Sequence, residues 1–407
     1  MDGTSIAAIV LVPLLAVLAP IVAALIGRVA KVPLVVFEIV LGLVFGPSLL
    51  GWIPESGFAE ALAQFGLALL FFMAGNEIDF TAIKGRPLRR AGLGWLISLV
   101  LGLVAGIALA PSVEAGVFIG IALTSTALGT IMPMLRDAGE LSTPFGRAAT
   151  AVGAVGEFGP LIAISLFLSG RSPGLAAVVL IGFAVISGLA IWLASRGPYK
   201  WLHSIVTATL HTSGQFAVRL VLLVVAALVC LSIALGLDML LAAFAAGILY
   251  RLLLSGANKP DLEFIESKLE AVAFGFLVPV FFIYTGVTFD LNSLLTEPNA
   301  LLLLPIFLVL LLVVRGLPGL LAAPVGASGN DRIALGLFSA TGLPIIVAVT
   351  SIGLEEGVLE AGTASALVGA GMLSVLVFPL IALTRRRKSL GGAKRPPDVD
   401  AHIPVEG

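Results

Sequence analysis

Charged residues are scarce in this sequence of 407 residues: they make up 12% of it, where a soluble protein has about 25%. A chain of this size with so few charges cannot cover a globular fold with a hydrated surface, which excludes a soluble enzyme. The net charge of -1 provides no overall positive field that would attract nucleic acid. The single cysteine, Cys230, excludes both a disulfide framework and a cysteine-ligated metal site.

Most of the sequence consists of long apolar segments, and 59% of the residues are hydrophobic. A membrane-spanning helix needs about 20 mostly apolar residues, because lipid offers the backbone no other hydrogen-bond partners. The first segment has no basic residues before it, so it is expected to be a retained helix and not a cleaved signal. Glycine, proline and charged residues divide the chain into thirteen predicted spans, at 5–26, 32–51, 58–76, 91–110, 115–135, 145–169, 174–195, 216–236, 239–255, 269–288, 299–322, 332–353 and 361–384.

The positions of the basic residues predict the orientation. With thirteen spans and the C-terminal tail inside, 20 of the 23 lysines and arginines fall in inside segments. Only Arg171 falls outside, and Arg219 and Arg315 lie within spans. Such a bias is expected of a correct topology. We therefore expect a multi-pass protein of the cell membrane, with its N-terminus outside and its C-terminus cytoplasmic.

The two halves of the chain resemble each other. Residues 34–42, 71–80, 119–128 and 160–163 match residues 239–247, 281–290, 335–344 and 379–382 in the same order. Because the matched spans lie seven crossings apart, the two repeats enter the membrane from opposite sides, as in secondary transporters. The predicted organisation is a first repeat at 1–173, a linker helix and inside loop at 174–215, a second repeat at 216–384, and a basic, proline-containing tail at 385–407.

Glu157 is the most informative polar residue, because a charge at the middle of a bilayer is costly. It lies ten residues from Arg147, and at 1.5 Å per residue this places it about 15 Å deep in a hydrocarbon core of about 30 Å. Small neighbours, among them Gly156, allow another backbone or water to approach. We expect Glu157 to bind the transported ion, although a carboxylate that only anchors two helices is the alternative.

Two groups of helix-weakening residues occupy equivalent positions in the two repeats. Hydroxyl groups compete for backbone hydrogen bonds and proline removes one, so each group is expected to interrupt its helix. Interrupted helices at matching positions of two repeats indicate a transporter site. The residues are Thr124, Ser125 and Thr126 in the first repeat, and Thr341, Gly342 and Pro344 in the second.

Arg315 lies in the span before the second interruption, and because its charge cannot titrate away it needs an anionic partner. Glu157 and the carbonyl end of a half-helix are the candidates, and extension toward the inner surface is the alternative. Glu38, Glu77 and Asp79 lie closer to the inner ends of their spans. We expect them to line a water-filled entrance or to cap helices.

Several stretches resemble the monovalent cation:proton antiporter superfamily, in the branch of bacterial sodium/proton and potassium/proton exchangers with a Kef-type membrane domain. The resemblance covers the second to thirteenth spans. The stretches are FEIVLGLVFGPSLLG, ALLFFMAGNEID, ALTSTALGTIMPMLRDAGE, GRAATAVGAVGEFGP and FSATGLPIIVAVTSIG.

The resemblance implies a homodimer with two crossed, interrupted helices, an elevator-like movement, and a carboxylate on the sixth helix that carries the ion. That carboxylate maps to Glu157, where the family usually has aspartate, and the preceding Asp, Asn or Gln is Gly156 here. The family's basic residue maps to Arg315. No glycine fingerprint for a nucleotide follows the last span, so neither a nucleotide nor another cofactor is expected.

One buried carboxylate suffices for exchange, because a proton and a cation compete for it and only the neutral, loaded forms cross an apolar barrier. The sequence therefore predicts a transporter and not an enzyme. It would exchange Na⁺ or K⁺ for H⁺ with one ion moved each way, and Glu157 would be the ligand of the metal cation. Na⁺ and K⁺ both suit carboxylate, hydroxyl and carbonyl oxygens. A gated monovalent-cation channel or efflux pathway and a membrane sensor are the rival hypotheses.

Overall fold

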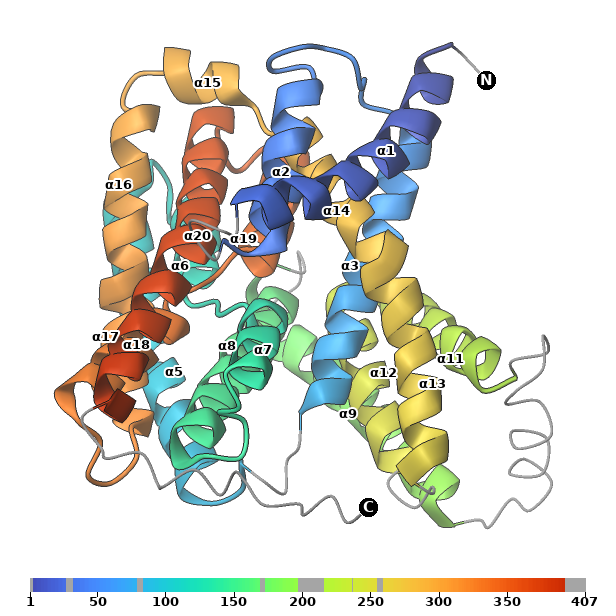
Figure 1. The fold of residues 1–407 in the computed structure, drawn as a ribbon, viewed down its shortest axis with the longest axis vertical. Helices are drawn as coiled ribbons and strands as arrows, with labels where there is room; N and C mark the ends of the chain where they lie inside the picture. Colours follow the sequence, from blue (N-terminus) through green and yellow to red (C-terminus); the bar gives the residue numbers. More distant parts are fainter. Residues whose placement is uncertain are drawn as a thin grey trace, which may run out of the picture.

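The computed structural model describes residues 3–26, 32–78, 83–168, 173–196, 216–235, 237–254 and 259–391. All regular secondary structure in these ranges is helical. The helices form two groups that stand side by side, shown at the left and right of Figure 1. α1 begins at one end of the molecule and α20 ends toward the other.

The first group, called the flanking bundle, holds helices from both halves of the chain. Its members are α1 (Gly3–Ile26), α2 (Leu34–Phe45), α3 (Gly57–Glu77), α11 (Phe216–Ala234), α12 (Met239–Leu254), α13 (Lys259–Val272), the π-helical turn η1 (Ala273–Leu277) and α14 (Val278–Val287). Helix α9 (Pro173–Arg196) contacts both α12 and a helix of the second group, so it lies between the two.

The second group, called the crossing bundle, contains the two interrupted helices. Its members are α5 (Arg86–Leu109), α6 (Val113–Leu123), α7 (Leu128–Asp137), α8 (Pro144–Phe167), the short α15 (Leu291–Thr296), α16 (Ala300–Leu310), η2 (Leu311–Gly316), α17 (Leu317–Gly319), η3 (Leu320–Ala322), α18 (Gly329–Ser339), α19 (Pro344–Glu355) and α20 (Ala361–Gly391).

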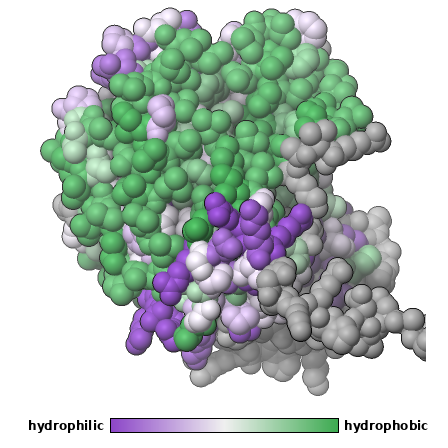
Figure 2. All heavy atoms as spheres, turned by 60° about the vertical axis from the view of Figure 1, so that its left-hand side comes forward, coloured by the Kyte–Doolittle hydropathy of each residue, from purple (hydrophilic) through white to green (hydrophobic). Residues whose placement is uncertain are grey.

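The surface of the molecule is that of a membrane protein. Figure 2 shows a broad hydrophobic face with hydrophilic residues gathered mainly below it. Nine stretches of the described chain are long and apolar enough to cross a membrane, and four shorter apolar helices accompany them. Each of the thirteen predicted segments contains a helix in the structure. The chain is therefore an all-α membrane protein, whereas the number of crossings stays a prediction.

Several predicted helix boundaries were wrong. The second span was predicted to reach residue 51, but α2 ends at Phe45, because Gly46 and Pro47 cannot continue a helix. α5 begins at Arg86, five residues earlier than predicted, with Pro87 in its first turn, where proline is tolerated. α20 continues through the arginines of the predicted tail as far as Gly391.

Glycines bring the helices of the flanking bundle into close contact. α2 packs on α14, where Gly42 lies against the carbonyl of Ile283, and a Cβ atom there would collide with it. α3 packs on α12 in the same manner, with Gly247 against the carbonyl of Phe72. Small residues permit such approach between membrane helices. In both contacts a helix of the N-terminal half pairs with one of the C-terminal half.

Candidate functional site

Two helices of the crossing bundle are interrupted where hydroxyl, glycine and proline residues occur. α6 ends at Leu123 and α7 begins at Leu128. In the second half, α18 ends at Ser339 and α19 begins at Pro344, which supplies no backbone N–H and suits a first helical position. The predicted residues Thr124, Ser125, Thr126, Thr341 and Gly342 all lie in these two breaks.

The two breaks contact each other directly. The backbone amide of Ala127 donates to the carbonyl of Thr341 at 2.7 Å, and the hydroxyl of Thr126 donates to the carbonyl of Ser339 at 2.6 Å. Gly342 lies so close to Ser125 that a Cβ atom would approach its Oγ to 2.8 Å. The structure therefore joins the two breaks into one polar site among apolar helices.

The hydroxyl groups of this site all donate to backbone carbonyls. Thr124 donates to Ile121, Ser125 to Ala122 and Thr341 to Leu337, at 2.8 to 3.0 Å. Such bonds satisfy carbonyls near the ends of interrupted helices. Because each hydroxyl uses its hydrogen as a donor, its oxygen lone pairs remain able to accept a hydrogen bond or to bind a cation.

Glu157 lies in the middle of α8 beside the first break, and it is 1% exposed. The backbone N–H of Leu128, the first residue of α7, lies close to its carboxylate. The positive end of the α7 dipole thus faces the carboxylate. Its Oε2 atom is buried without a hydrogen-bond partner among the described residues. Because an unpaired buried oxygen is costly, this atom is suited to bind a proton or a cation.

Gly156 makes room for the contacts around Glu157. Its carbonyl accepts a hydrogen bond of 2.9 Å from the backbone N–H of Thr126. A Cβ atom at this position would collide with the Nη2 atom of Arg315 and with the hydroxyl of Thr126. The position therefore requires glycine so that α8, the first break and Arg315 can meet.

Arg315 is fully buried in the π-helical turn η2 and reaches the same site from the second half. Its Nε donates to the Oγ1 of Thr126 at 2.8 Å, and its Nη2 donates to the carbonyl of Val152 at 2.7 Å. Of the two partners suggested by the sequence, Glu157 forms no ion pair with Arg315, although the structure describes both residues. Arg315 is instead held by neutral oxygens, one of which contacts the carbonyl end of α18.

Two of the predicted entrance residues lie in helices of the flanking bundle and not in the breaks. Glu77, at the end of α3, forms an ion pair of 3.5 Å with Arg136 of α7, which also approaches Glu270 of α13 to 3.8 Å. These contacts join the two bundles. Glu38 is buried in α2. Asp79 lies outside the described residues.

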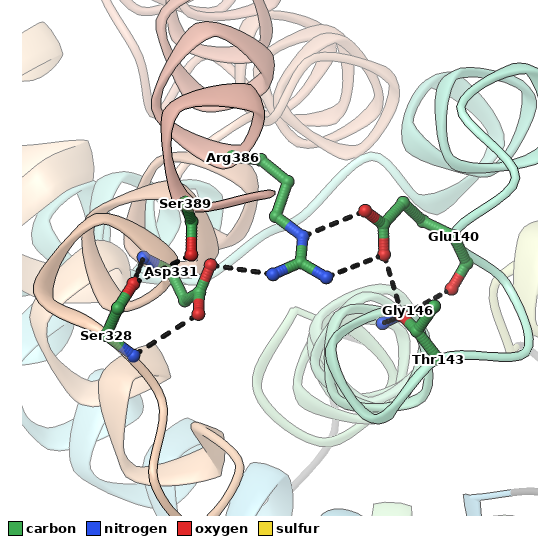
Figure 3. Close-up of polar contacts among 7 residues, drawn as sticks. All are labelled: Glu140, Thr143, Gly146, Ser328, Asp331, Arg386 and Ser389. Atoms are coloured by element: carbon green, nitrogen blue, oxygen red, sulfur yellow. Dashed lines mark hydrogen bonds and ion pairs between the residues drawn. The ribbon is translucent and has the colours of Figure 1, made fainter. Parts of the chain in front are cut away.

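Sequence reasoning missed a polar network at the end of α20 (Figure 3). Arg386 binds both carboxylate oxygens of Glu140 at 2.9 Å and Asp331 at 2.7 Å. Thr143 donates to Glu140, and Ser328 caps α18 in a capping box with Asp331. The network joins α20 and α18 to the segment between α7 and α8. No sequence signal pointed to it, because Arg386 was assigned to the tail.

Comparison with known proteins identifies the family. Residues 14–383 match the model of the sodium/hydrogen exchanger family, which describes its transmembrane region. The chain belongs to the sodium/hydrogen exchanger family. This is a family of transporters, and the match covers both interrupted helices, α8 and Arg315.

Relatives of this sodium/hydrogen exchanger domain include antiporters from bacteria. The putative Na⁺/H⁺ antiporter YjbQ of Bacillus subtilis is 26% identical over 93% of this chain, which spans 63% of YjbQ. The Na⁺/H⁺-K⁺ antiporter GerN of Bacillus cereus is 28% identical over 85% of this chain and 88% of its own. The sodium proton antiporter MjNhaP1 from Methanocaldococcus jannaschii has the same fold, with a TM-score of 0.68, 18% identity, and coverage of 96% and 99% of the two chains.

Proposed function

We propose that this protein exchanges a monovalent cation, Na⁺ or K⁺, for a proton across a membrane, with Glu157 as the shared binding group. The observation that carries the proposal is the unpaired Oε2 atom of a carboxylate that is buried beside two broken helices. Membership of the exchanger family and the names of YjbQ and GerN support the same activity.

Competition for one carboxylate explains the exchange. Desolvation favours the neutral carboxyl group, and a bound cation also neutralises the charge. The empty carboxylate is an anion that an apolar barrier rejects, because moving an unpaired charge through it is costly. Only the protonated and the cation-bound forms of Glu157 therefore change sides, and one cation crosses for each proton. Arg315 is too basic to carry a second proton and stays charged.

The hydroxyl groups of the two breaks complete the proposed cation site. Ser125, Thr124 and Thr341 use their hydrogens on backbone carbonyls, which leaves their oxygen lone pairs for a cation. Thr126 has a different role, because its oxygen already accepts from Arg315 while its hydrogen bonds to Ser339. We assign Thr126, Gly156, Gly342 and Pro344 to positioning the breaks, and Glu77, Glu38 and Asp79 to the entrance.

The proposed topology has thirteen membrane crossings in two inverted repeats, residues 1–173 and 216–384, joined by residues 174–215. α2 packs on α14, and α3 packs on α12. This pairing of helices between the two halves of the chain supports such a repeat. The orientation places the N-terminus outside and the tail, residues 385–407, in the cytoplasm. We further propose that a homodimer in the cell membrane is the working form, and that the crossing bundle moves against the flanking bundle.

Reconstitution into liposomes with a pH-sensitive dye inside tests the proposal. An inward gradient of Na⁺ or K⁺, with the membrane potential clamped, should drive proton efflux from the vesicles. Glu157→Gln should abolish this flux, because an amide carries no titratable proton that a cation could replace. Glu355→Gln, at an exposed carboxylate at the end of α19, is the matched control and should retain it.

The outcomes separate exchange from its rivals. Cation flux without proton movement would indicate a channel, and exchange that charges the vesicles would overturn the one-for-one stoichiometry. Full activity in Glu157→Gln, with Glu355→Gln behaving identically, would move the binding site away from Glu157. Comparison of Na⁺ and K⁺ gradients in the same vesicles identifies the cation.

A further inference from the structure

A recess lined by arginines opens at the end of the crossing bundle that carries the last turns of α20. Its cavity volume is about 100 Å³. This is below the roughly 300 Å³ at which sites for drug-sized ligands begin, so the recess accommodates only a small group. It is formed by the first turns of α5 and α8 together with the segment that follows η3. The lining residues are Arg86, Pro87, Arg90, Pro144, Arg147, Ala148, Ala322, Ala323, Pro324 and Val325.

Three of these side chains are cationic, and none of the lining residues is acidic. Arg90 donates to the carbonyl of Leu321 at 3.4 Å, and Arg147 donates to the carbonyl of Ser142 at 3.1 Å. Neither of them, nor Arg86, forms an ion pair with an acidic side chain in the part of the chain that the structure describes. The recess therefore concentrates positive charge that no described carboxylate neutralises.

Nearby acidic groups are already used by another arginine. Glu140, close to the start of α8, and Asp331, at the start of α18, both bind Arg386 (Figure 3). Because both carboxylates already bind Arg386, neither neutralises the arginines of the recess. In addition, α5 and α8 both begin at the recess, so the positive ends of their dipoles add to the charge of the arginines.

The recess lies where the hydrophobic surface ends. One turn beyond Arg90, the exposed side of α5 becomes apolar and continues with Leu93, Leu96, Val100 and Val104, each more than half exposed. Such a helix face contacts acyl chains in a membrane. An amphiphile whose acyl chains cover this face would hold its headgroup at the level of Arg86 and Arg90.

We propose that this recess binds the phosphate group of an anionic phospholipid. Basic pockets between membrane helices at a membrane surface are suited to acidic lipid headgroups, and arginine binds phosphate oxygens through paired N–H groups. A bound phosphate would contact α5 and α8 of the first half and the segment after η3 of the second. It would therefore stabilise the cytoplasmic end of the crossing bundle. The site is independent of the cation that Glu157 carries.

The test compares lipid binding by the full chain and two triple variants in a neutral detergent. In the first variant Arg86, Arg90 and Arg147 become glutamine. The matched control carries Arg89→Gln, Arg332→Gln and Arg387→Gln, which remove the same charge from exposed positions outside the recess. Phosphatidylglycerol, phosphatidylcholine and inorganic phosphate are the probes, with retained lipid measured by native mass spectrometry and unfolding by tryptophan fluorescence.

We expect phosphatidylglycerol, but not phosphatidylcholine, to bind and to raise the unfolding temperature of the unmodified chain and of the control. The first variant should bind it roughly fivefold more weakly for each arginine removed. Equal binding by the two variants would overturn the site. If inorganic phosphate at the same concentration raises the unfolding temperature as much, the recess binds phosphate, but a lipid as the source of that phosphate is overturned. If the triple variant does not fold, Arg147→Gln against Arg332→Gln gives the same comparison with one charge.

Discussion

The Nε atom of Arg315 lies 2.8 Å from the hydroxyl oxygen of Thr126, and this bond joins η2 of the second half to the break in the first half. Thr126 extends the contact, because its hydroxyl donates to the carbonyl of Ser339 at the end of α18. The charge of Arg315 thus acts on the negative end of a helix dipole. One residue thereby fixes the relative position of both broken helices.

Arg315→Gln is expected to destabilise the protein. The substitution leaves the buried oxygens of Thr126 and Val152 without a charged donor, and each unsatisfied group costs about 1–3 kcal/mol. Arg315→Lys keeps the charge but cannot reach both oxygens in the same way, so an intermediate loss is expected. Thermal unfolding in detergent, followed by tryptophan fluorescence, measures the order of the three proteins. An Arg315→Gln protein as stable as the unmodified chain would contradict this role.

Gly156→Ala is expected to disrupt the site although it adds only a methyl group. That methyl group would collide with Arg315 and Thr126, so α8 must move away from the first break. We expect a loss of about 1–3 kcal/mol in the free energy of unfolding and a large loss of exchange. Gly182→Ala in α9 is the control, because a Cβ atom there meets no neighbouring atom and alanine favours a helix. Equal effects of the two substitutions would show that no close contact exists at Gly156.

The two breaks could be predicted from sequence because their causes are local. Pro344 lacks a backbone N–H, and the hydroxyls of Thr124 and Ser125 bond to carbonyls three residues earlier. The same local reasoning could not supply the partner of Arg315. A buried arginine requires hydrogen-bond acceptors, but Thr126 is 189 positions away, and only the packing of the helices selects it over Glu157.

Other features had no sequence signal at all. The π-helical turn at 273–277, like the one that contains Arg315, adds a residue to a helical turn without a distinctive residue type. The contact between Glu77 and Arg136 depends on how the two bundles lie against each other. Apolar periodicity predicts that a helix exists, but it does not predict which polar ends meet. For this reason the entrance could be proposed from sequence only as a set of separate residues.

Glu77→Gln is expected to weaken the contact between the two bundles. The carboxylate of Glu77 forms an ion pair of 3.5 Å with Arg136 of α7, and 11% of the Glu77 side chain is exposed. Because 52% of the Arg136 side chain is exposed, the loss in the free energy of unfolding should be about 1 kcal/mol or less. Thermal unfolding in detergent, followed by tryptophan fluorescence, measures this loss.

The control for this prediction is Glu270→Gln. Glu270 approaches the same Arg136 to 3.8 Å, but its side chain is 42% exposed. Its removal should therefore cost less than the removal of the more buried Glu77. A larger loss in Glu270→Gln than in Glu77→Gln would contradict this order.

Arg386 and Glu140 are expected to be strongly coupled in stability. Their charge-assisted contact is nearly buried, with 13% and 4% of the two side chains exposed, and it joins residues 246 positions apart. Removing Arg386 leaves the buried carboxylate of Glu140 unpaired, which costs about 3–5 kcal/mol in comparable pairs. Arg386 has a second partner in Asp331, so Arg386→Gln should cost more than Glu140→Gln. The double variant should cost less than the sum of the two, because the loss of Arg386 then no longer leaves Glu140 unpaired. A double-mutant cycle on the free energy of unfolding measures the coupling, and additive losses would mean that the contact is too exposed to connect the two halves.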